Sequence, residues 1–300
     1  MMEETIRSLR ERIQENAQRT EAALRALGQA ADGDLQELFD AEAYSLLGGG
    51  KRIRPFLVNE VCRALGGREE VSMPFACALE MIHTYSLIHD DLPCMDDDDM
   101  RRGKPTCHKR FGYATALLAG DALLTKAFLV AASNPSADDR ARSAAVRLLG
   151  ECAGECGMIG GQIMDLRGET EKLSEERLVR LHSMKTGALM ECAALLGVLA
   201  AGRDLNGAEA EAARGYARRI GLAFQIVDDI LDAVGDEAAL GKPIGSDASC
   251  HKTTFLTYYG VEEARAYAAR LTEEAVGAIA DWEDSACLAD LAVYLLERTF

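Results

Sequence analysis

One helix-forming stretch constrains the fold more than any other part of the chain. Between residues 220 and 234, apolar residues cover most of a helix circumference, but four polar residues recur at helical spacing: Gln225, Asp228, Asp229 and Asp232. Positions i, i+3, i+4 and i+7 of a helix form one stripe. Three carboxylates therefore lie along the inward face of an apolar helix. Buried charges are costly unless they are paired, so this helix needs neighbours that enclose a cation-binding interior.

A second acidic stretch, residues 81–103, ends an apolar run in a group of aspartates and then turns basic. Asp90 and Asp96 are six residues apart and would not share a face of a regular helix. Pro93 lies between them and breaks the helix, so we expect Asp96 to fold back beside Asp90. Runs of like charge usually lie in water, and the aspartates at 97–99, taken alone, indicate a solvated loop.

The rest of the chain predicts one helix after another. Apolar residues at helical spacing predict an N-terminal helix that ends at the break at residues 31–34. Further helices are expected up to residue 47, from residue 51, from about 71 to Pro93, at about 113–132, 138–157, 174–201 and 208–234, and twice after a loop at 235–249. No alternating run is long enough for a sheet. We therefore predict an all-α fold, an antiparallel helix bundle with a central cavity.

Composition excludes several classes of protein. No linker or low-complexity segment divides the chain, so residues 1–300 are predicted to form one domain. The net charge of −16 argues against a nucleic-acid partner. The nine cysteines show no metal-ligand spacing and indicate a reducing, cytoplasmic location. The N-terminus is acidic, and we expect no apolar run to span a membrane, so we predict no targeting segment and no stable membrane association.

A glycine-rich basic turn forms the third feature. Three glycines at 48–50 end one helix, and the run Lys51 to Pro55 opens the next with three cations. Flexible backbone and positive charge at a helix start suit a phosphate group. A solvated basic turn explains the local pattern equally well.

Two inward carboxylate clusters select a hard divalent cation. Oxygen ligands favour Mg²⁺, which commonly shares its coordination shell with phosphate oxygens, so a diphosphate could bridge the clusters. Cations that could neutralise the remaining charge are Lys51, Arg54, Arg101, Arg102, Lys185, Lys242 and Lys252. The predicted apolar wall consists of Met81, Ile82, Tyr85, Met184 and Phe224. A metal-bound diphosphate beside a hydrocarbon pocket indicates an isoprenoid diphosphate as the substrate.

Seven motifs along the chain carry a family resemblance. In order they are GGGKRIRP, MIHTYSLIHDDLPCMDDDDMRRGKPTCH, LAGDALL, GGQ-x-x-DL, HxxKTGAL, GLAFQIVDDILD and LGKPIGSD. The chain resembles the trans-isoprenyl diphosphate synthases (polyprenyl synthetases), most closely the bacterial farnesyl diphosphate synthase type. The resemblance implies the isoprenoid synthase fold, Mg²⁺ as cofactor, isopentenyl and allylic diphosphates as substrates, and a homodimer.

The resemblance also implies roles for residues at matching positions. It assigns Mg²⁺ to Asp90, Asp91, Asp96, Asp228, Asp229 and Asp232. It assigns the allylic diphosphate to Arg101, Lys185 and Lys242, and isopentenyl diphosphate to Lys51, Arg54, His83 and Arg102. Thr186 and Gln225 would lie along the developing carbocation. Without the resemblance, a lone histidine on an apolar helix, such as His83, would be interpreted as a core residue, and no role is assigned to His108 or His182.

The implied reaction needs no nucleophilic side chain. Diphosphate leaves an allylic substrate such as dimethylallyl or geranyl diphosphate, the double bond of isopentenyl diphosphate attacks the cation, and a proton is lost to the diphosphate. Because the cation must be kept dry, residues 235–249 are expected to close the site, although a plain surface connection fits the same pattern.

Tyr85 and Ser86 bear on product length. Tyr85 precedes Asp90 by five residues, about 7.5 Å of helix, on the side toward which an allylic tail would extend. A bulky Tyr85 next to a small Ser86 would stop the tail near ten carbons and give farnesyl diphosphate, the fifteen-carbon product. Tyr85 could instead simply pack between helices. Geranylgeranyl diphosphate is the alternative product.

Three other functions use related features. A terpene cyclase also uses an aspartate-rich motif, but it has no need of GGGKRIRP for a second substrate. A catalytically silent partner subunit would be expected to have lost aspartates, and none is missing. A diphosphate hydrolase gains nothing from a long apolar pocket. Chain elongation therefore remains the favoured interpretation.

Overall fold

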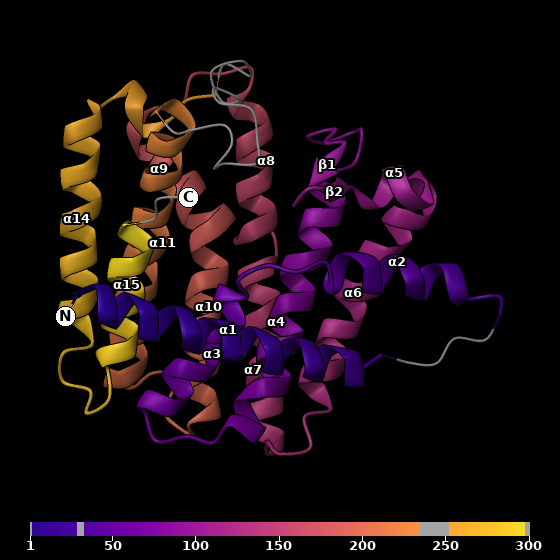
Figure 1. The fold of residues 1–300 in the computed structure, drawn as a ribbon, viewed down its shortest axis with the longest axis horizontal. Coiled ribbons are helices and arrows are strands. Elements are labelled where there is room, and N and C mark those ends of the chain that lie inside the picture. Colours follow the sequence, from indigo (N-terminus) through magenta and orange to yellow (C-terminus); the bar gives the residue numbers. More distant parts are fainter. Residues whose placement is uncertain (1, 29–32, 235–251, 298–300) are drawn as a thin grey trace.

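The computed structural model describes residues 2–28, 33–234 and 252–297, and most of them are helical (Figure 1). The first half contains α1 (Met2–Ala26), α2 (Gln36–Leu46), α3 (Ile53–Ala64), α4 (Glu69–Asp90), β1 (Met100–Arg101), β2 (Lys104–Pro105), α5 (Cys107–Phe111) and α6 (Tyr113–Ala132). The second half contains α7 (Asp139–Ala153), α8 (Met158–Gly168), α9 (Glu175–His182), a π-helix η1 (Ser183–Gly187), α10 (Ala188–Ala200), α11 (Ala208–Val234), a 3₁₀ turn η2 (Phe255–Thr257), α14 (Val261–Ala278) and α15 (Ala286–Leu296). The all-α prediction is confirmed.

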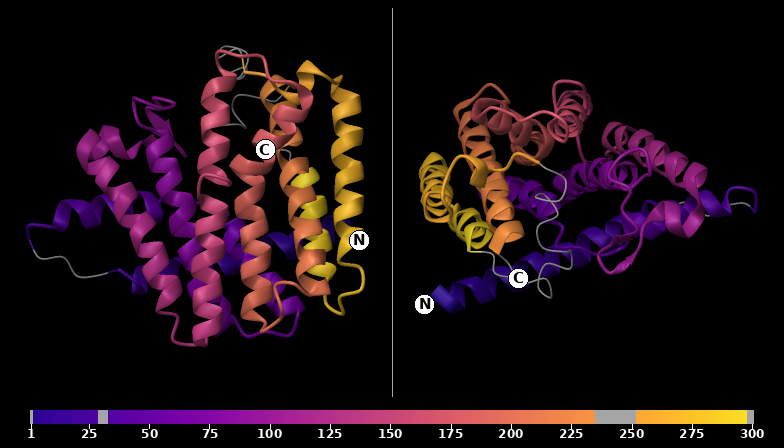
Figure 2. Two further views of the ribbon diagram at one scale, coloured as in Figure 1. Left: turned by 180° about the vertical axis from the view of Figure 1, so that it is seen from behind. Right: turned by 90° about the horizontal axis from the view of Figure 1, so that it is seen from above.

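The long helices form an upright bundle, and α1 lies across one flank of it (Figures 1 and 2). Within the bundle α4 packs on α3, α6 and α10, and α11 packs on α10 and α14. Short connections reverse the chain between α6 and α7 and between α10 and α11, as expected for antiparallel neighbours. The bundle therefore presents the ends of α4, α8 and α11, together with the β1–β2 hairpin, toward the same end of the molecule (Figure 1).

The core depends on close approach of helices that carry small residues. Every residue of α10 from Cys192 to Ala200 is buried. A methyl group added at Gly197 would lie 2.6 Å from Cβ of Val61 and 2.7 Å from the carbonyl oxygen of Val58, both in α3. Because protein interiors are already close-packed, a larger residue at 197 would push α3 and α10 apart.

A buried ion pair fixes the glycine-rich basic turn. Arg52, at φ 52°, precedes α3, and its side chain is 1% exposed. The guanidinium donates to Glu80 of α4 at 2.6 Å and to the carbonyl oxygen of Leu46 at 2.7 Å. Removing one member of such a pair leaves an uncompensated buried charge. Arg52 therefore holds the turn against α4, which leaves its neighbours Lys51 and Arg54 to face a pocket.

The elements differ from the predictions in three places. The helix predicted for 138–157 ends at Ala153, and the unpredicted helix α8 follows. Its sequence, MIGGQIMDLRG, contains glycines that disfavour helix when they are considered alone, so tertiary packing decides its structure. The stretch predicted as one helix at 174–201 contains the π-helix η1, and residues 100–105 form a two-stranded ladder although no sheet was predicted.

Three helical stretches among the described residues are long and apolar enough to cross a membrane, judged by length and composition alone. This corrects the expectation that no run reaches that length. In α4 and in the stretch Glu175–Ala200, 72% and 67% of the apolar window is buried inside the bundle, and this packing accounts for the apolar composition. In α6 only 33% is buried, so its outer face needs a separate explanation.

Candidate functional site

A cavity of about 560 Å³ lies among α4, α6, α8 and η1. Asp90, Lys185 and Thr186 give it a polar boundary. Most of the remaining lining is apolar and includes Leu87, Leu92, Leu117, Leu124, Met158, Ile159, Ile163, Leu166 and Leu189. A volume of this size is typical of pockets that enclose a small organic ligand. The cavity therefore suits a hydrocarbon chain attached to a charged group.

The first aspartate motif begins where α4 ends. The backbone N–H of Asp96 donates to the carbonyl oxygen of Asp90 at 2.9 Å, so the chain turns back after Pro93, and the predicted fold-back is confirmed. Burial raises the pKa of Asp90 to about 6, with Lys185 opposing the shift and Asp96 adding to it. A carboxyl group whose pKa is raised in this way is short of positive charge. The position therefore fits a bound cation.

Asp91 already has a cation partner within the chain. Both of its carboxylate oxygens accept hydrogen bonds from Nε of Arg101, at 2.7 and 2.9 Å, and Nη2 of Arg101 lies 2.6 Å from Oδ1. Asp91 is 3% exposed. In this arrangement Asp91 holds the β1 strand through Arg101. Its predicted part in metal binding, and that of Arg101 in diphosphate binding, remain predictions.

An aspartate that sequence reasoning missed organises two of the predicted lysines. Oδ2 of Asp165, on α8, accepts from Nζ of Lys185 at 2.6 Å and from Nζ of Lys252 at 3.3 Å. Burial alone would raise the pKa of Asp165, but the two ammonium groups hold it below its usual value. Burial likewise opposes the charge of Lys252, but Asp165 and Asp96 raise its pKa. The only sequence signal for Asp165 was its place in the motif GGQ-x-x-DL.

The π-helix η1 directs Lys185 and Thr186 to the cavity. A methyl group at Gly161 would lie 2.3 Å from the backbone nitrogen of Lys185, so α8 touches the widened turn closely. A methyl group at Gly221 of α11 would lie 3.2 Å from Cα of Gly187. Single π turns inside helices frequently occur at functional sites. Here glycines on two neighbouring helices make room for that turn.

The second aspartate motif lies on α11 as predicted. Asp229 is buried and accepts a hydrogen bond from the backbone N–H of Phe255 at 2.7 Å. Asp228 and Asp232 are half-buried, and Nε2 of Gln225 donates to Asp228 at 3.3 Å. The amide oxygen of Gln225 can only accept a hydrogen bond. Oε1 therefore accepts from Nδ1–H of His182, 3.1 Å away. This motif therefore anchors the segment that carries Lys252.

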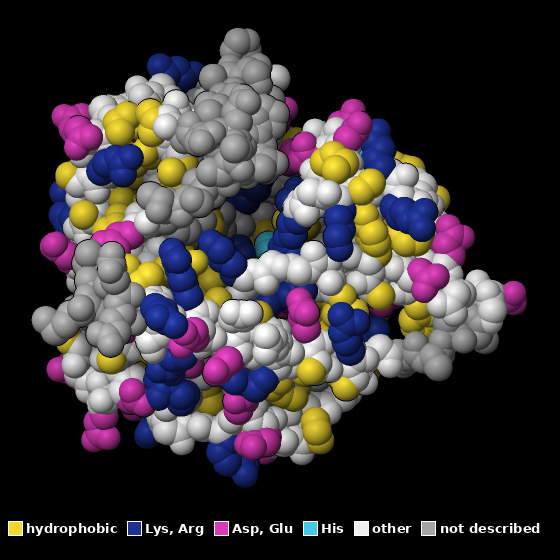
Figure 3. All heavy atoms as spheres, viewed as in Figure 1, with side chains coloured by type: hydrophobic (Ala, Val, Ile, Leu, Met, Phe, Trp, Pro, Cys, Tyr) yellow, Lys and Arg dark blue, Asp and Glu magenta, His cyan; other side chains and the backbone are white. Residues whose placement is uncertain are grey.

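A smaller basic pocket of about 130 Å³ contains the residues predicted to bind isopentenyl diphosphate. Lys51, Arg54, His83 and Arg102 all line it, together with Thr186 and Phe224. Nη1 of Arg54 lies 3.4 Å from Nε2 of His83. Burial, and then the charges of Arg54 and Arg102, lower the pKa of His83 well below its usual value, so this imidazole is neutral. Figure 3 shows a hollow in this face with Lys and Arg side chains around it.

The glycines of the basic turn make room for Arg102. Gly50 has φ +121°, and a methyl group there would lie 2.9 Å from the guanidinium carbon of Arg102. The guanidinium also donates to the carbonyl oxygen of Gly49. Lys51 is exposed, with its ammonium 5.4 Å from the centre of the Tyr294 ring. The turn thus brings cations from α3 and from the β1–β2 hairpin to one pocket.

Tyr85 and Ser86 both line the larger cavity. Tyr85 is 4% exposed, and its hydroxyl has no hydrogen-bond partner among the described residues. Burial, helped by the charge of Asp90, raises the pKa of Tyr85 to about 12. The Ser86 hydroxyl donates back to the carbonyl oxygen of His83 at 2.9 Å, which leaves the bulk of the wall at this level to Tyr85.

Apart from Tyr85, the residues predicted to form the apolar wall do not line this cavity. Met81 and Ile82 are fully buried in the core and do not reach the cavity. Met184 lines a separate groove, and Phe224 lines the basic pocket. Residues of α6 and α8 supply the wall instead, and α8 was not predicted as a helix. Lys242 and the proposed closing loop at 235–249 lie outside the described residues.

Comparison with known proteins identifies the family. Residues 36–290 match the model of the polyprenyl synthetase family. The chain is 45% identical over 261 residues to farnesyl diphosphate synthase of Escherichia coli, covering 85% of this chain and 87% of that protein. The chain belongs to the polyprenyl synthetase family. It is a prenyltransferase of the short-chain trans-prenyl diphosphate synthase class, which elongates prenyl diphosphate chains.

Relatives with different products match this synthase about equally well. It is 48% identical over 245 residues to the large subunit 1 of the heterodimeric geranylgeranyl pyrophosphate synthase of Arabidopsis thaliana, covering 80% of this chain and 66% of that protein. The solved structure of an FPP/GFPP synthase from Zymomonas mobilis superposes with a TM-score of 0.87 and 35% identity, covering 97% and 99% of the two chains. The fold is therefore that of the isoprenoid synthases.

The aspartates of both motifs fit the divalent metal that this family generally uses. Asp90 is short of positive charge, Asp96 is exposed beside it, and carboxylate oxygens are the donors that Mg²⁺ prefers. The protein would hold the metal through Asp90 and Asp96 on one side and Asp228, Asp229 and Asp232 on the other.

Proposed function

We propose that this synthase condenses isopentenyl diphosphate with dimethylallyl and then geranyl diphosphate to give farnesyl diphosphate. The observation that carries the product assignment is Tyr85, a buried aromatic side chain that lines the tail cavity about 7.5 Å along α4 from Asp90. One isoprene unit is about as long as one 5.4 Å helical turn. Two units span about 11 Å, and the tail starts from a metal-bound diphosphate beyond the Asp90 carboxylate, so a ten-carbon tail would end near Tyr85 and a longer one would meet the ring.

The protein's own groups supply binding, orientation and exclusion of water. Lys185 and Lys252, held by Asp165, and Arg101, held by Asp91, would counter the charge of the allylic diphosphate. Lys51, Arg54 and Arg102 would bind the second diphosphate in the basic pocket. Thr186 lines both pockets, so its hydroxyl would lie near the developing cation. Bound Mg²⁺ would stabilise the negative charge that develops on the departing diphosphate.

His83 is a weak base, which suits a site that forms a carbocation. Burial, and then the charges of Arg54 and Arg102, hold its pKa well below the usual value, so the ring has less tendency than a free imidazole to take a proton from the cation. The apolar lining from α6 and α8 would exclude water from the tail. These features favour transfer to a carbon–carbon double bond over hydrolysis.

Incubation with Mg²⁺, isopentenyl diphosphate and geranyl diphosphate, followed by product chromatography, tests this function. We expect a linear fifteen-carbon diphosphate and no product without the metal. A cyclic hydrocarbon would show a cyclase, free alcohol alone would show a hydrolase, and no product would indicate a silent subunit.

Geranylgeranyl diphosphate is the second candidate product, because synthases that carry that name match the chain as well as farnesyl diphosphate synthases do. A twenty-carbon main product in the same incubation would establish it. It would also remove Tyr85 from the role of a floor.

We also infer a cytoplasmic homodimer. Leu118 and Leu129 of α6 are 57% and 62% exposed, and they lie eleven residues apart on one face of that helix. Ala122, half-buried, and Ala132, exposed, belong to the same stripe. An apolar stripe of this length on an outer helix indicates a partner surface, and a second copy of the chain would bury it against itself.

A further inference from the structure

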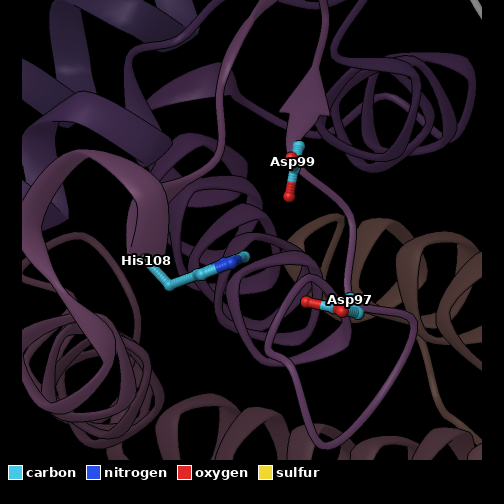
Figure 4. A group of neighbouring side chains, drawn as sticks. All are labelled: Asp97, Asp99 and His108. Atoms are coloured by element: carbon cyan, nitrogen blue, oxygen red, sulfur yellow. The ribbon is translucent and has the colours of Figure 1, made fainter.

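Three side chains that the proposed reaction does not use converge beside the first aspartate motif (Figure 4). Asp97 and Asp99 lie in the loop before β1, and His108 lies in α5. One ligand atom from each residue lies within 4.8 Å of the other two. The two aspartates are exposed, whereas His108 is 8% exposed. Figure 4 shows the imidazole pointing toward the space between the two carboxylates.

Hydrogen bonding fixes the tautomer of His108. The Thr106 hydroxyl has one hydrogen, which it donates to the carbonyl oxygen of Asp98 at 2.8 Å. Its contact with Nδ1 of His108, at 3.1 Å, therefore requires Nδ1–H to be the donor. In a neutral ring the lone pair then lies on Nε2. That atom is buried and has no hydrogen-bond partner within the described part of the chain.

The charges around Nε2 leave a place for a cation. The other two members of the triad are carboxylates within 4.8 Å of the ring's ligand atom, so nothing in the triad donates a hydrogen bond to Nε2. Nζ of Lys109 lies 2.7 Å from Oδ1 of Asp99 and neutralises that carboxylate from the side. One negative charge remains on Asp97, beside an orphaned ring nitrogen. A buried polar atom without a partner is costly, and a metal ion would satisfy all three groups together.

We propose that Asp97, Asp99 and His108 bind a divalent transition-metal ion of the Zn²⁺ class, at a site separate from the Mg²⁺ ligands of the two aspartate motifs. Imidazole nitrogen favours Zn²⁺ and its neighbours over Mg²⁺, which prefers oxygen ligands alone. Two carboxylates and one imidazole supply three of the four tetrahedral positions. The exposed side of the aspartates leaves the fourth position to water.

The bound ion would tie a loop that serves the diphosphate site to α5. Asp97 directly follows Asp96, and Asp99 lies two residues before Arg101. The loop is already tethered at one point, where the backbone N–H of Thr106 donates to the carbonyl oxygen of Asp99 at 3.0 Å. A metal ion would add a second tether on the other side of that loop. It therefore stabilises the loop and takes no part in the chemical step.

Histidine-selective ¹H–¹⁵N NMR tests the site directly, because the chain has only five histidines. The His108 signals are assigned by their loss in His108→Gln. Spectra of the wild-type protein are recorded at neutral pH with excess Mg²⁺ and no diphosphate, before and after one equivalent of Zn²⁺. We expect an Nδ1–H tautomer at the start and a change in the Nε2 resonance of His108 that is complete at one equivalent.

Two carboxylates of the same loop provide the test variant and its control: Asp97 is exposed, and Asp98 is half-buried with Oδ2 3.7 Å from Nη2 of Arg101. Asp97→Asn removes one proposed ligand, and asparagine tolerates the left-handed φ of 52° at this position. Asp98→Asn removes the same charge from the same loop, outside the triad. The Zn²⁺ response of His108 should be lost in Asp97→Asn and kept in Asp98→Asn. An unchanged His108 signal in the wild type, a doubly protonated His108 ring in the metal-free protein, or an equal response in both variants would overturn the proposal.

Discussion

At the scale of single residues, the pocket that a lysine lines predicts which substrate it binds. Lys51 lines the small basic pocket and is absent from the lining of the larger cavity. Lys51→Ala should therefore raise KM for isopentenyl diphosphate by about tenfold or more, since a charge-assisted hydrogen bond contributes about 1.5–3 kcal/mol. KM for geranyl diphosphate should change much less. Steady-state kinetics with each substrate varied in turn measures both.

Lys172→Ala is the matched control for this prediction. Lys172 is also an exposed lysine over a tyrosine ring, 6.0 Å from the centre of Tyr258, but it lines neither pocket. Both KM values should stay at the wild-type level in that variant. Equal increases for the two substrates in Lys51→Ala would show that the basic pocket is not a separate subsite.

At the scale of secondary-structure elements, His182 joins the end of α9 to α11. Burial lowers its pKa to about 4, with the hydrogen bond to Gln225 opposing the shift. The unfolded chain binds a proton on this ring below about pH 6.5, whereas the folded protein does not until about pH 4. The unfolded state therefore binds more protons in that window, and stability is lost as the pH falls through it.

Replacing this ring should flatten the pH dependence of stability. As the pH falls from about 7 to about 5, this ring should lower the free energy of unfolding of the wild type by about 2 kcal/mol. Over the same range, the free energy of unfolding of His182→Gln should fall by about 2 kcal/mol less than that of the wild type. Denaturant unfolding of both proteins at several pH values measures the difference. Parallel curves for the two proteins would mean that His182 is protonated as readily in the folded state as in the unfolded chain.

Helical periodicity was sufficient to predict elements whose apolar face packs simply. The polar stripe at 225–232 placed its aspartates on α11, and the proline rule placed the turn after α4. Periodicity could not predict α8 or the π-helix η1, because these depend on contacts between helices. The backbone of Lys185, for example, can approach α8 because position 161 is a glycine.

The same limit applies to the candidate site. Motif aspartates and cations can be recognised from sequence, but which cation pairs with which carboxylate depends on the folded backbone. The pairing of Asp91 with Arg101 and the bridge from Asp165 to two lysines were therefore not predicted. The wall of the tail cavity was assigned largely to the wrong residues for the same reason.

At the scale of the whole molecule, the exposed stripe on α6 predicts the assembly. Replacing both Leu118 and Leu129 by glutamate would place two charges in the inferred interface and should convert a dimer to a monomer, because burying unpaired like charges is strongly unfavourable. Sedimentation velocity of the wild type and the double variant measures the change. The control is Gln14→Glu with Gln18→Glu, which adds the same two charges at exposed positions of α1 outside the stripe and should leave the dimer intact. A monomeric wild type, or a double variant that remains dimeric, would contradict the inferred interface.

The central claim is that an allylic tail extends from the aspartate motifs into a cavity that Tyr85 closes. It is tested most directly by giving the wild type and Tyr85→Ala either geranyl or farnesyl diphosphate as the sole allylic substrate, together with isopentenyl diphosphate and Mg²⁺. Mass spectrometry then measures the chain length of each product. We expect the wild type to extend geranyl but not farnesyl diphosphate, and Tyr85→Ala to extend both and to form products of twenty carbons or more. Wild-type extension of farnesyl diphosphate as fast as geranyl diphosphate, or an active Tyr85→Ala that still stops at fifteen carbons, would contradict it.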